Sequence, residues 1–212
     1  MYDYLKDPVA IERESFRQIR ELTDLSAYSD DEAQVAMRLV HTCGDPGVVE
    51  QLRLSPNAIE KGLQALAADA PILCDVEMVR HGLTRRYIDN PTHCFLNLDG
   101  IGERAKALGE TRTMAALEHW PRLMEGAIIV IGNAPTALFR LLEMLAKGEV
   151  KPALIIAMPV GFVGAQESKQ ALWDAQQWLD VSTITLLGRR GGSALAVATL
   201  NALARIQIAE RY

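Results

Sequence analysis

The side chain best suited to proton chemistry is His41, in the segment Val40-His-Thr-Cys-Gly44. This segment ends a predicted helix, and the negative end of the helix dipole favours the protonated imidazolium. A histidine so placed is able to donate a proton near neutral pH. The simpler alternative is a histidine that caps the helix or packs beside Met37. Cys43 lies two residues away, so a Cys–His nucleophile pair is a further, weaker hypothesis.

Ser15 and three glycine-containing loops are the next candidates for contact with a ligand. Ser15 shares a helical face with Ile11 and Ile19, which indicates either a core hydroxyl or a group that faces a ligand. Glycine lets the backbone approach a ligand closely, and helix N-termini attract anions. Each loop alone is equally well explained as a tight turn from a strand into a helix, but together they predict an anion site. Their sequences are Gly132-Asn-Ala-Pro-Thr136, Met158-Pro-Val-Gly-Phe-Val-Gly164 and Gly188-Arg-Arg-Gly-Gly-Ser193.

Arginines accompany these loops and indicate the class of anion. Arg189 and Arg190 carry forked donors that suit carboxylates or phosphates. Arg112, at a predicted helix start, and Thr84-Arg85-Arg86 add positive charge, although each arginine alone is more simply a solvated surface residue. Neither GxxxxGK[ST] nor GxGxxG occurs, so no nucleotide is specifically indicated. Dispersed arginines suit a ligand with several separated carboxylates.

The elements that must position these residues change in character at residue 70. Before it, helical spacing predicts a helix from Asp7-Pro8, one from a Ser29–Glu32 capping box to Gly44, and one from Ser55-Pro56. After it, apolar runs that do not alternate are separated by helical segments, which predicts an α/β fold with a doubly wound, parallel, five-stranded sheet and helices on both faces. The expected organisation is one domain over 1–212, with a helical N-terminal part (1–69) and a sheet part (70–212). The five expected strands are 71–75, 94–97, 127–131, 153–157 and 183–187, and the later helices are 111–124, 134–147, 165–179 and 193–208.

The composition of the chain excludes several classes of protein. The 212 residues include 27 acidic and 22 basic side chains, for a formal charge of -5, and 49% are apolar. These values are typical of a globular chain and argue against a disordered protein or a nucleic-acid coat. No apolar run approaches the roughly 20 residues of a membrane span, and the N-terminus does not resemble a signal peptide. Three scattered cysteines predict reduced thiols in the cytoplasm, and four dispersed histidines without CxxC or HExxH predict no metal site.

Taken in chain order, the motifs resemble the precorrin-8X methylmutase family of cobalamin biosynthesis. The resemblance extends over nearly the whole chain, and the last three segments are the longest. The matching segments are Asp7 to Phe16, His41 to Gly44, Ser55-Pro56, Ala70 to Asp75, Gly82 to Thr84, Thr111-Arg112, Ile131 to Arg140, Met158 to Gly164 and Gly188 to Ser193.

The resemblance implies a flavodoxin-like fold and a homodimer with pockets at or near the subunit interface. It implies an isomerase that moves a methyl group from C-11 to C-12 of a tetrapyrrole without an added cofactor. The product is hydrogenobyrinate, or cobyrinate when the substrate carries cobalt. The family's catalytic histidine falls on His41, and the expected partners are a tetrapyrrole with several carboxylates and neighbouring corrin-pathway enzymes that receive the product.

The expected substrate-binding residues come from the loops and the basic segments. Two other functions stay open: a corrinoid carrier without turnover, and another small-anion enzyme such as a phosphosugar isomerase. Asn57 and Asp69 depart from the glycine or small residue expected in some relatives, and the tail after Ala204 lies outside the motifs. The expected binding residues are Ser15, Thr84, Arg112, Asn133, Pro135, Val160, Gly161, Phe162, Gly188, Arg189, Arg190 and Gly191.

Overall fold

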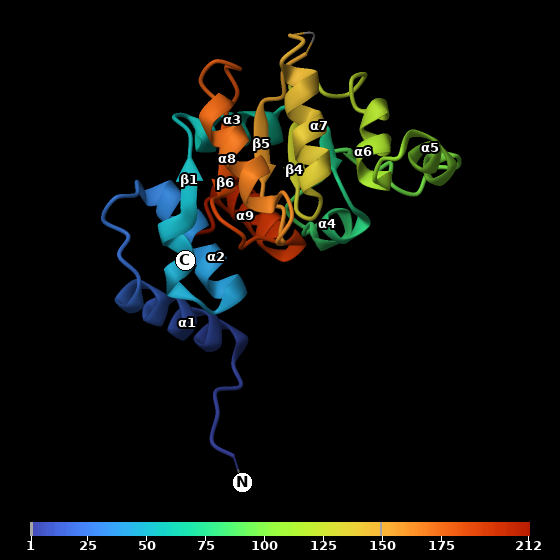
Figure 1. The fold of residues 1–212 in the computed structure, drawn as a ribbon. Helices are drawn as coiled ribbons and strands as arrows, with labels where there is room; N and C mark the ends of the chain where they lie inside the picture. The colour runs from blue at the N-terminus through green and yellow to red at the C-terminus, as the bar shows by residue number, and fades with distance from the viewer. Residues whose placement is uncertain (1, 149) are drawn as a thin grey trace.

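The central layer of the protein is a six-stranded sheet. The computed structural model describes residues 2–148 and 150–212. The strand order is β1-β6-β5-β4-β2-β3, and all neighbours are parallel except β1, which is antiparallel to β6 (Figure 1). The expected count of five strands is therefore wrong by one edge strand. The strands are β1 (Leu52–Leu54), β2 (Ile72–Cys74), β3 (Thr92–His93), β4 (Ile128–Ile131), β5 (Leu154–Ala157) and β6 (Thr183–Leu186).

The missed strand β1 also changes how the third predicted helix begins. Ser55 does not start a helix: its backbone N–H donates to Thr183 O at 2.9 Å, and its hydroxyl accepts from Thr183 N at 2.8 Å. The helix begins at Ala58, after Asn57 in the left-handed conformation (φ 63°). Asp69 also has positive φ (52°), so both departures from the expected small residues stand where the backbone favours glycine.

Helices cover both faces of the sheet, as the sequence predicts. Two segments differ from the expectations: the helix expected over 111–124 ends its α-helical part at Ala116, and the strand expected over 94–97 lies at 92–93. The helices are α1 (Pro8–Leu22), α2 (Asp30–Cys43), α3 (Ala58–Ala67), α4 (Glu77–Gly82), α5 (Ile101–Leu108), α6 (Arg112–Ala116), α7 (Pro135–Leu145), α8 (Ala165–Ala175) and α9 (Ser193–Gln207), with 3₁₀ turns η1 (Pro46–Gln51) and η2 (Leu117–His119).

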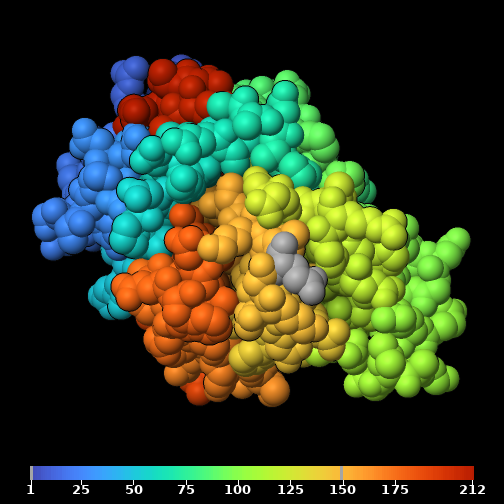
Figure 2. Space-filling view, turned by 90° about the horizontal axis from the view of Figure 1, so that it is seen from above, coloured from blue at the N-terminus to red at the C-terminus, as the bar shows by residue number. Residues whose placement is uncertain are grey.

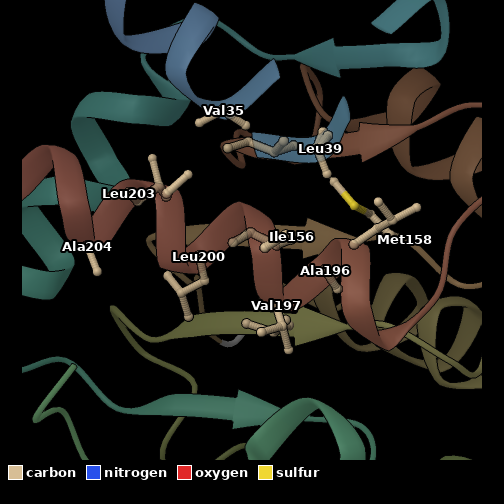
Figure 3. Packing of buried hydrophobic residues seen from close by; sticks show 14 of the residues in the cluster. Val35, Leu39, Ile156, Met158, Ala196, Val197, Leu200, Leu203 and Ala204 are labelled. Atoms are coloured by element: carbon tan, nitrogen blue, oxygen red, sulfur yellow. The ribbon is translucent and has the colours of Figure 1, made fainter. Parts of the chain in front are cut away.

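Alternate residues of β2, β4 and β5 enter two different cores. One core joins α1, α2, α3, α4 and α9 to one face of the sheet, and the other joins α7 and α8 to the opposite face. In Figure 3, Val35 and Leu39 of α2 lie on the side of α9 that carries Leu203, and all three belong to the cluster that also contains Ile156 of β5. The N-terminal helices thus share a continuous core with the sheet, which fixes the position of α2 and of His41 at its end.

The ends of α1 and α2 follow the predicted capping signals. The Asp7 side chain accepts from Val9 N, with Pro8 in the first turn. Ser29 and Glu32 form a reciprocal capping box, and Gly44 ends α2 in the left-handed conformation (φ 66°). His41 therefore lies in the last helical turn, as expected. No helix among the described residues combines the length and apolar character needed to cross a membrane.

Candidate active site

His41 is held by two consecutive residues of α1. Its Nδ1 lies 2.9 Å from the Ser15 hydroxyl oxygen. Its ring stacks on Phe16, with 5.0 Å between the ring centroids and 13° between the planes. Phe16 is buried, whereas His41 is exposed. The α1 helix therefore fixes one nitrogen and one face of the imidazole, and Nε2 has no hydrogen-bond partner among the described residues.

Burial and the positive charge of Arg38 hold the pKa of His41 below its ordinary value, and Glu12 acts in the opposite direction. This direction is opposite to that expected from the helix dipole alone. Partial desolvation of the ring is the larger cause and the neighbouring guanidinium is the second. The neutral imidazole is therefore favoured near neutral pH, and a neutral imidazole still carries one N–H that is able to donate a hydrogen bond.

The loop from Gly132 to Thr136 is built around a buried carboxylate, Asp75. Its two oxygens accept hydrogen bonds from the backbone N–H groups of Gly132, Asn133 and Ala134 at 3.0, 2.9 and 2.9 Å. Burial raises the pKa of Asp75, while these N–H donors favour its ionised form. Pro135 then begins α7 in the first helical position. The Asn133 side chain is left exposed at the carboxyl edge of the sheet.

The other two predicted loops lie against each other at the same edge. Gly192 N donates to Met158 O at 2.8 Å, and Gly161 N donates to Arg189 O at 3.3 Å. A Cβ atom on Gly191 would lie 2.4 Å from Met158 O, so only glycine fits this contact. The structure thus brings the 158–164 and 188–193 loops together from different βα units.

The 158–164 and 188–193 loops carry an exposed surface that is both apolar and basic. The exposed side chains are those of Val160 (44%), Phe162 (87%) and Val163 (88%). The guanidinium carbon of Arg189 lies 5.9 Å from the Phe162 ring centroid. Gly188 adopts φ +80°, which turns the chain into the arginine pair after β6. A flat apolar ligand with peripheral anions fits such a surface.

Arg190 connects this loop to the His41 turn. Its Nη1 lies 2.9 Å from Asp45 Oδ2, and Asp45 follows the Gly44 cap of α2. Its carbonyl accepts a hydrogen bond of 2.5 Å from Nζ of Lys169, a buried lysine of α8. The Arg190 charge is thus partly compensated within the protein, whereas Arg189 forms no ion pair among the described residues.

Two predicted binding residues are not brought to His41 within one chain. Thr84 N donates to Asn201 Oδ1 at 3.0 Å, which places Thr84 beside the middle of α9 and away from its N-terminus. Arg112 begins α6, where its Nη2 donates to Leu96 O and Asn97 Oδ1, both at 2.9 Å. Figures 1 and 2 show α2 and α6 toward opposite ends of the molecule.

Sequence reasoning missed three residues that shape the site. Asp75 is a charged residue directly after a buried strand, and Lys169 lies on the same helical face as Ala165 and Leu172. A charge in an apolar pattern is the signal that was available for both. Asp45 had no such signal, because its partner Arg190 is distant in the sequence. No cluster of three or more His, Cys, Asp or Glu side chains suited to a metal ion occurs in residues 2–148 and 150–212.

The comparisons with known proteins agree on one family. The family model for precorrin-8X methylmutase matches residues 10–206. A precorrin-8X methylmutase of Pseudomonas aeruginosa is 50% identical over 206 residues, which cover 96% of this chain and 98% of the relative. A cobalt-precorrin-8 methylmutase of Methanocaldococcus jannaschii is 37% identical over 179 residues, covering 84% and 81%.

A solved structure agrees with both relatives. The precorrin-8X methylmutase of Thermus thermophilus superposes with a TM-score of 0.85 at 38% identity, covering 96% of this chain and 98% of that one. The family model, the relatives and the solved structure each cover most of the chain. The chain therefore belongs to the precorrin-8X methylmutase family.

Proposed function

We propose that this chain moves the methyl group of precorrin-8X from C-11 to C-12, with His41 as the group that hydrogen-bonds to the macrocycle. The observation that carries the proposal is the His41 imidazole, held at Nδ1 by Ser15 and on one face by Phe16 in a chain of this family. The carbon–methyl bond at C-11 breaks and the bond at C-12 forms within one molecule. No atom is gained or lost, so the reaction needs no nucleophile from the protein.

The role of His41 is to stabilise one arrangement of protons on the ring nitrogens during the shift. If the Ser15 hydroxyl donates to Nδ1, the imidazole proton lies on Nε2 and points away from that contact. Because the pKa of His41 is lowered, a neutral N–H donor is the form present at neutral pH. A donor aimed where charge develops lowers the barrier without full proton transfer.

The macrocycle's carboxylates are proposed to meet the carboxyl edge of the sheet. The five parallel strands, counted in chain order, run 2-1-3-4-5, which is the flavodoxin-like order. Ligands of such sheets bind at the switch point, here between β2 and β4, where Asn133 and Pro135 lie. Arg189, Arg190 and the N–H group of Gly191 supply further donors, and Val160 and Phe162 cover the apolar ring.

A second copy of the chain is proposed to complete the site. Arg112 and Thr84 are part of the motif set, yet each lies apart from His41 within one chain. Phe162 and Val163 are almost fully exposed, which is costly for large apolar side chains unless a ligand or a partner covers them. A homodimer in which Arg112 of one subunit faces His41 of the other accounts for both observations.

The proposed substrate is the cobalt-free form. The relative at 50% identity carries the name precorrin-8X methylmutase, and the one named for cobalt-precorrin-8 is 37% identical. Incubation of the enzyme with each form, followed by absorbance, tests this choice. Faster conversion of the cobalt form would overturn it.

The test of the main proposal is the His41→Ala variant. Loss of the hydrogen-bond donor is expected to lower turnover by on the order of 10²-fold or more and to change affinity by less than about tenfold. The matched control is His81→Ala, which removes an exposed histidine of α4. Absorbance during turnover distinguishes an enzyme from a carrier, since a carrier gives only a static spectrum. Near-normal turnover in His41→Ala would contradict the assignment.

A further inference from the structure

The C-terminal tail, residues 208–212, returns from α9 to the two helices that carry the His41 site. Arg211 Nη1 lies 2.6 Å from Asp31 Oδ1, and Tyr212 N donates to Gln34 Oε1 at 2.7 Å; both partners lie on α2. Arg20 of α1 donates to Tyr212 O. Figure 1 shows the C-terminus next to α1 and α2. The tail therefore joins α1 to α2 although it lies outside the recognised motifs.

Three aromatic rings connect the tail to His41. The Tyr212 and Phe16 centroids are 3.7 Å apart with 10° between the planes, and Phe16 stacks in turn on His41. At these distances and angles, the Tyr212 and His41 rings would collide if both lay on the same face of the Phe16 ring. Phe16 therefore lies between Tyr212 and His41, and its position depends on the ring on either side.

Cations hold the Tyr212 ring in its place. The guanidinium carbon of Arg205 lies 4.3 Å from the Tyr212 centroid, and that of Arg38 lies 5.7 Å away. Such contacts attract the guanidinium to the face of the ring and stabilise its position. Arg205 is itself fixed by Glu12 of α1, with 3.0 Å between Nη1 and Oε1. The Tyr212 ring therefore lies in a charged cluster. The cluster includes Arg38 and Glu12, the two charged groups that shift the pKa of His41.

We propose that Tyr212 is a positioning residue for His41, acting through Phe16 to set the plane of the imidazole. Ser15 fixes the direction of Nδ1, and the ring stack fixes the tilt, so together they aim Nε2. The inference rests on the proposed role of His41. It assigns the tail a part in the reaction that the motif set does not include.

The proposed positioning of His41 depends on the aromatic ring of Tyr212 and not on its hydroxyl. The hydroxyl oxygen is buried and has no hydrogen-bond partner among residues 2–148 and 150–212. Tyr212→Phe therefore keeps every contact named above and serves as the matched control. Tyr212→Leu removes the stacked ring and both cation contacts while the residue stays apolar.

The experiment measures turnover, KM and the His41 pKa by NMR in full-length Tyr212→Leu and Tyr212→Phe. In Tyr212→Leu we expect a fall in kcat of about tenfold or more, since a displacement of about 1 Å is able to cost 10²-fold. KM should change less than about threefold, and the pKa of His41 should rise toward its ordinary value as water reaches the stack. Tyr212→Phe should match the wild type in all three.

A tail that only stabilises the fold would lower the melting temperature and leave kcat and the His41 pKa of the folded enzyme unchanged, which would overturn the inference. If Tyr212→Leu does not fold, Arg211→Ala weakens the same tail by removing one ion pair. It should give a smaller fall in kcat with the same direction of pKa change, and wild-type values would again overturn the inference. If the wild type shows no turnover, the proposed function fails, and the NMR pKa still tests the contact from Tyr212 to His41.

Discussion

Lys169 shows how a single buried charge supports the proposed binding surface. The side chain is fully buried on α8, and its Nζ contacts the Arg190 carbonyl. No carboxylate lies within ion-pair distance of it among the described residues. Burial lowers its pKa from 10.5 to about 8. The protein therefore holds a buried ammonium beneath the arginine loop, where its hydrogen bond to the Arg190 carbonyl offsets part of the cost of burial.

The lowered pKa of Lys169 predicts a specific dependence of stability on pH. Between pH 8 and pH 10.5 the unfolded chain binds a proton at this lysine that the folded chain has released. The free energy of unfolding at this site therefore rises with pH over that window and is lowest below pH 8. Urea unfolding at pH 7.5, 9 and 10.5 should show the wild type gaining stability relative to Lys169→Met. Lys106→Met, at an exposed position of α5, is the control, and parallel curves for Lys169→Met and wild type would contradict the prediction.

At the scale of elements, the sequence predicts the parts whose signals are local. The capping box of α2 and its Gly44 end place His41 correctly, and the glycine loops lie at one sheet edge because parallel strands end there. The strand β1 was missed because three residues are too few to show a period of two, and it forms only by pairing with β6. The Arg190–Asp45 pair and the Tyr212 stack depend on the tertiary fold, so no local pattern predicts them.

The contact between the two glycine loops predicts a sharp effect at Gly191. In Gly191→Ala the new methyl group would overlap the Met158 carbonyl, so the arginine loop must move away from the 158–164 loop. Overpacking of this kind costs about 1–3 kcal/mol. We expect a lower melting temperature and a tetrapyrrole affinity reduced by about tenfold or more, measured by absorbance titration. Gly102→Ala in α5 is the control, because a Cβ there meets open space, and equal affinities for the two variants would refute the contact's role.

At the scale of the whole molecule, the two ends of the proposed site lie apart. His41 is at the end of α2, and Arg112 begins α6, toward the opposite end of the molecule in Figure 1. Arg112 is exposed, and its guanidinium is directed by Leu96 O and Asn97 Oδ1. A fixed, exposed arginine in a motif of the family suits contact with another chain. The proposed homodimer would then carry two equivalent sites, each with residues from both subunits.

Complementation between two defective chains tests this arrangement. His41→Ala is expected to abolish most turnover, and Arg112→Ala to weaken substrate binding by about 1–3 kcal/mol, the scale of a charge-assisted contact. If each site takes His41 from one subunit and Arg112 from the other, a mixed dimer contains one fully wild-type site and one doubly defective site. Random re-association of the two variants after mild dissociation should therefore restore about a quarter of the wild-type sites. The measurement is turnover at substrate concentrations below KM, where each variant alone has little activity. Activity that stays at the mean of the two separate variants would show that each chain supplies both residues to its own site.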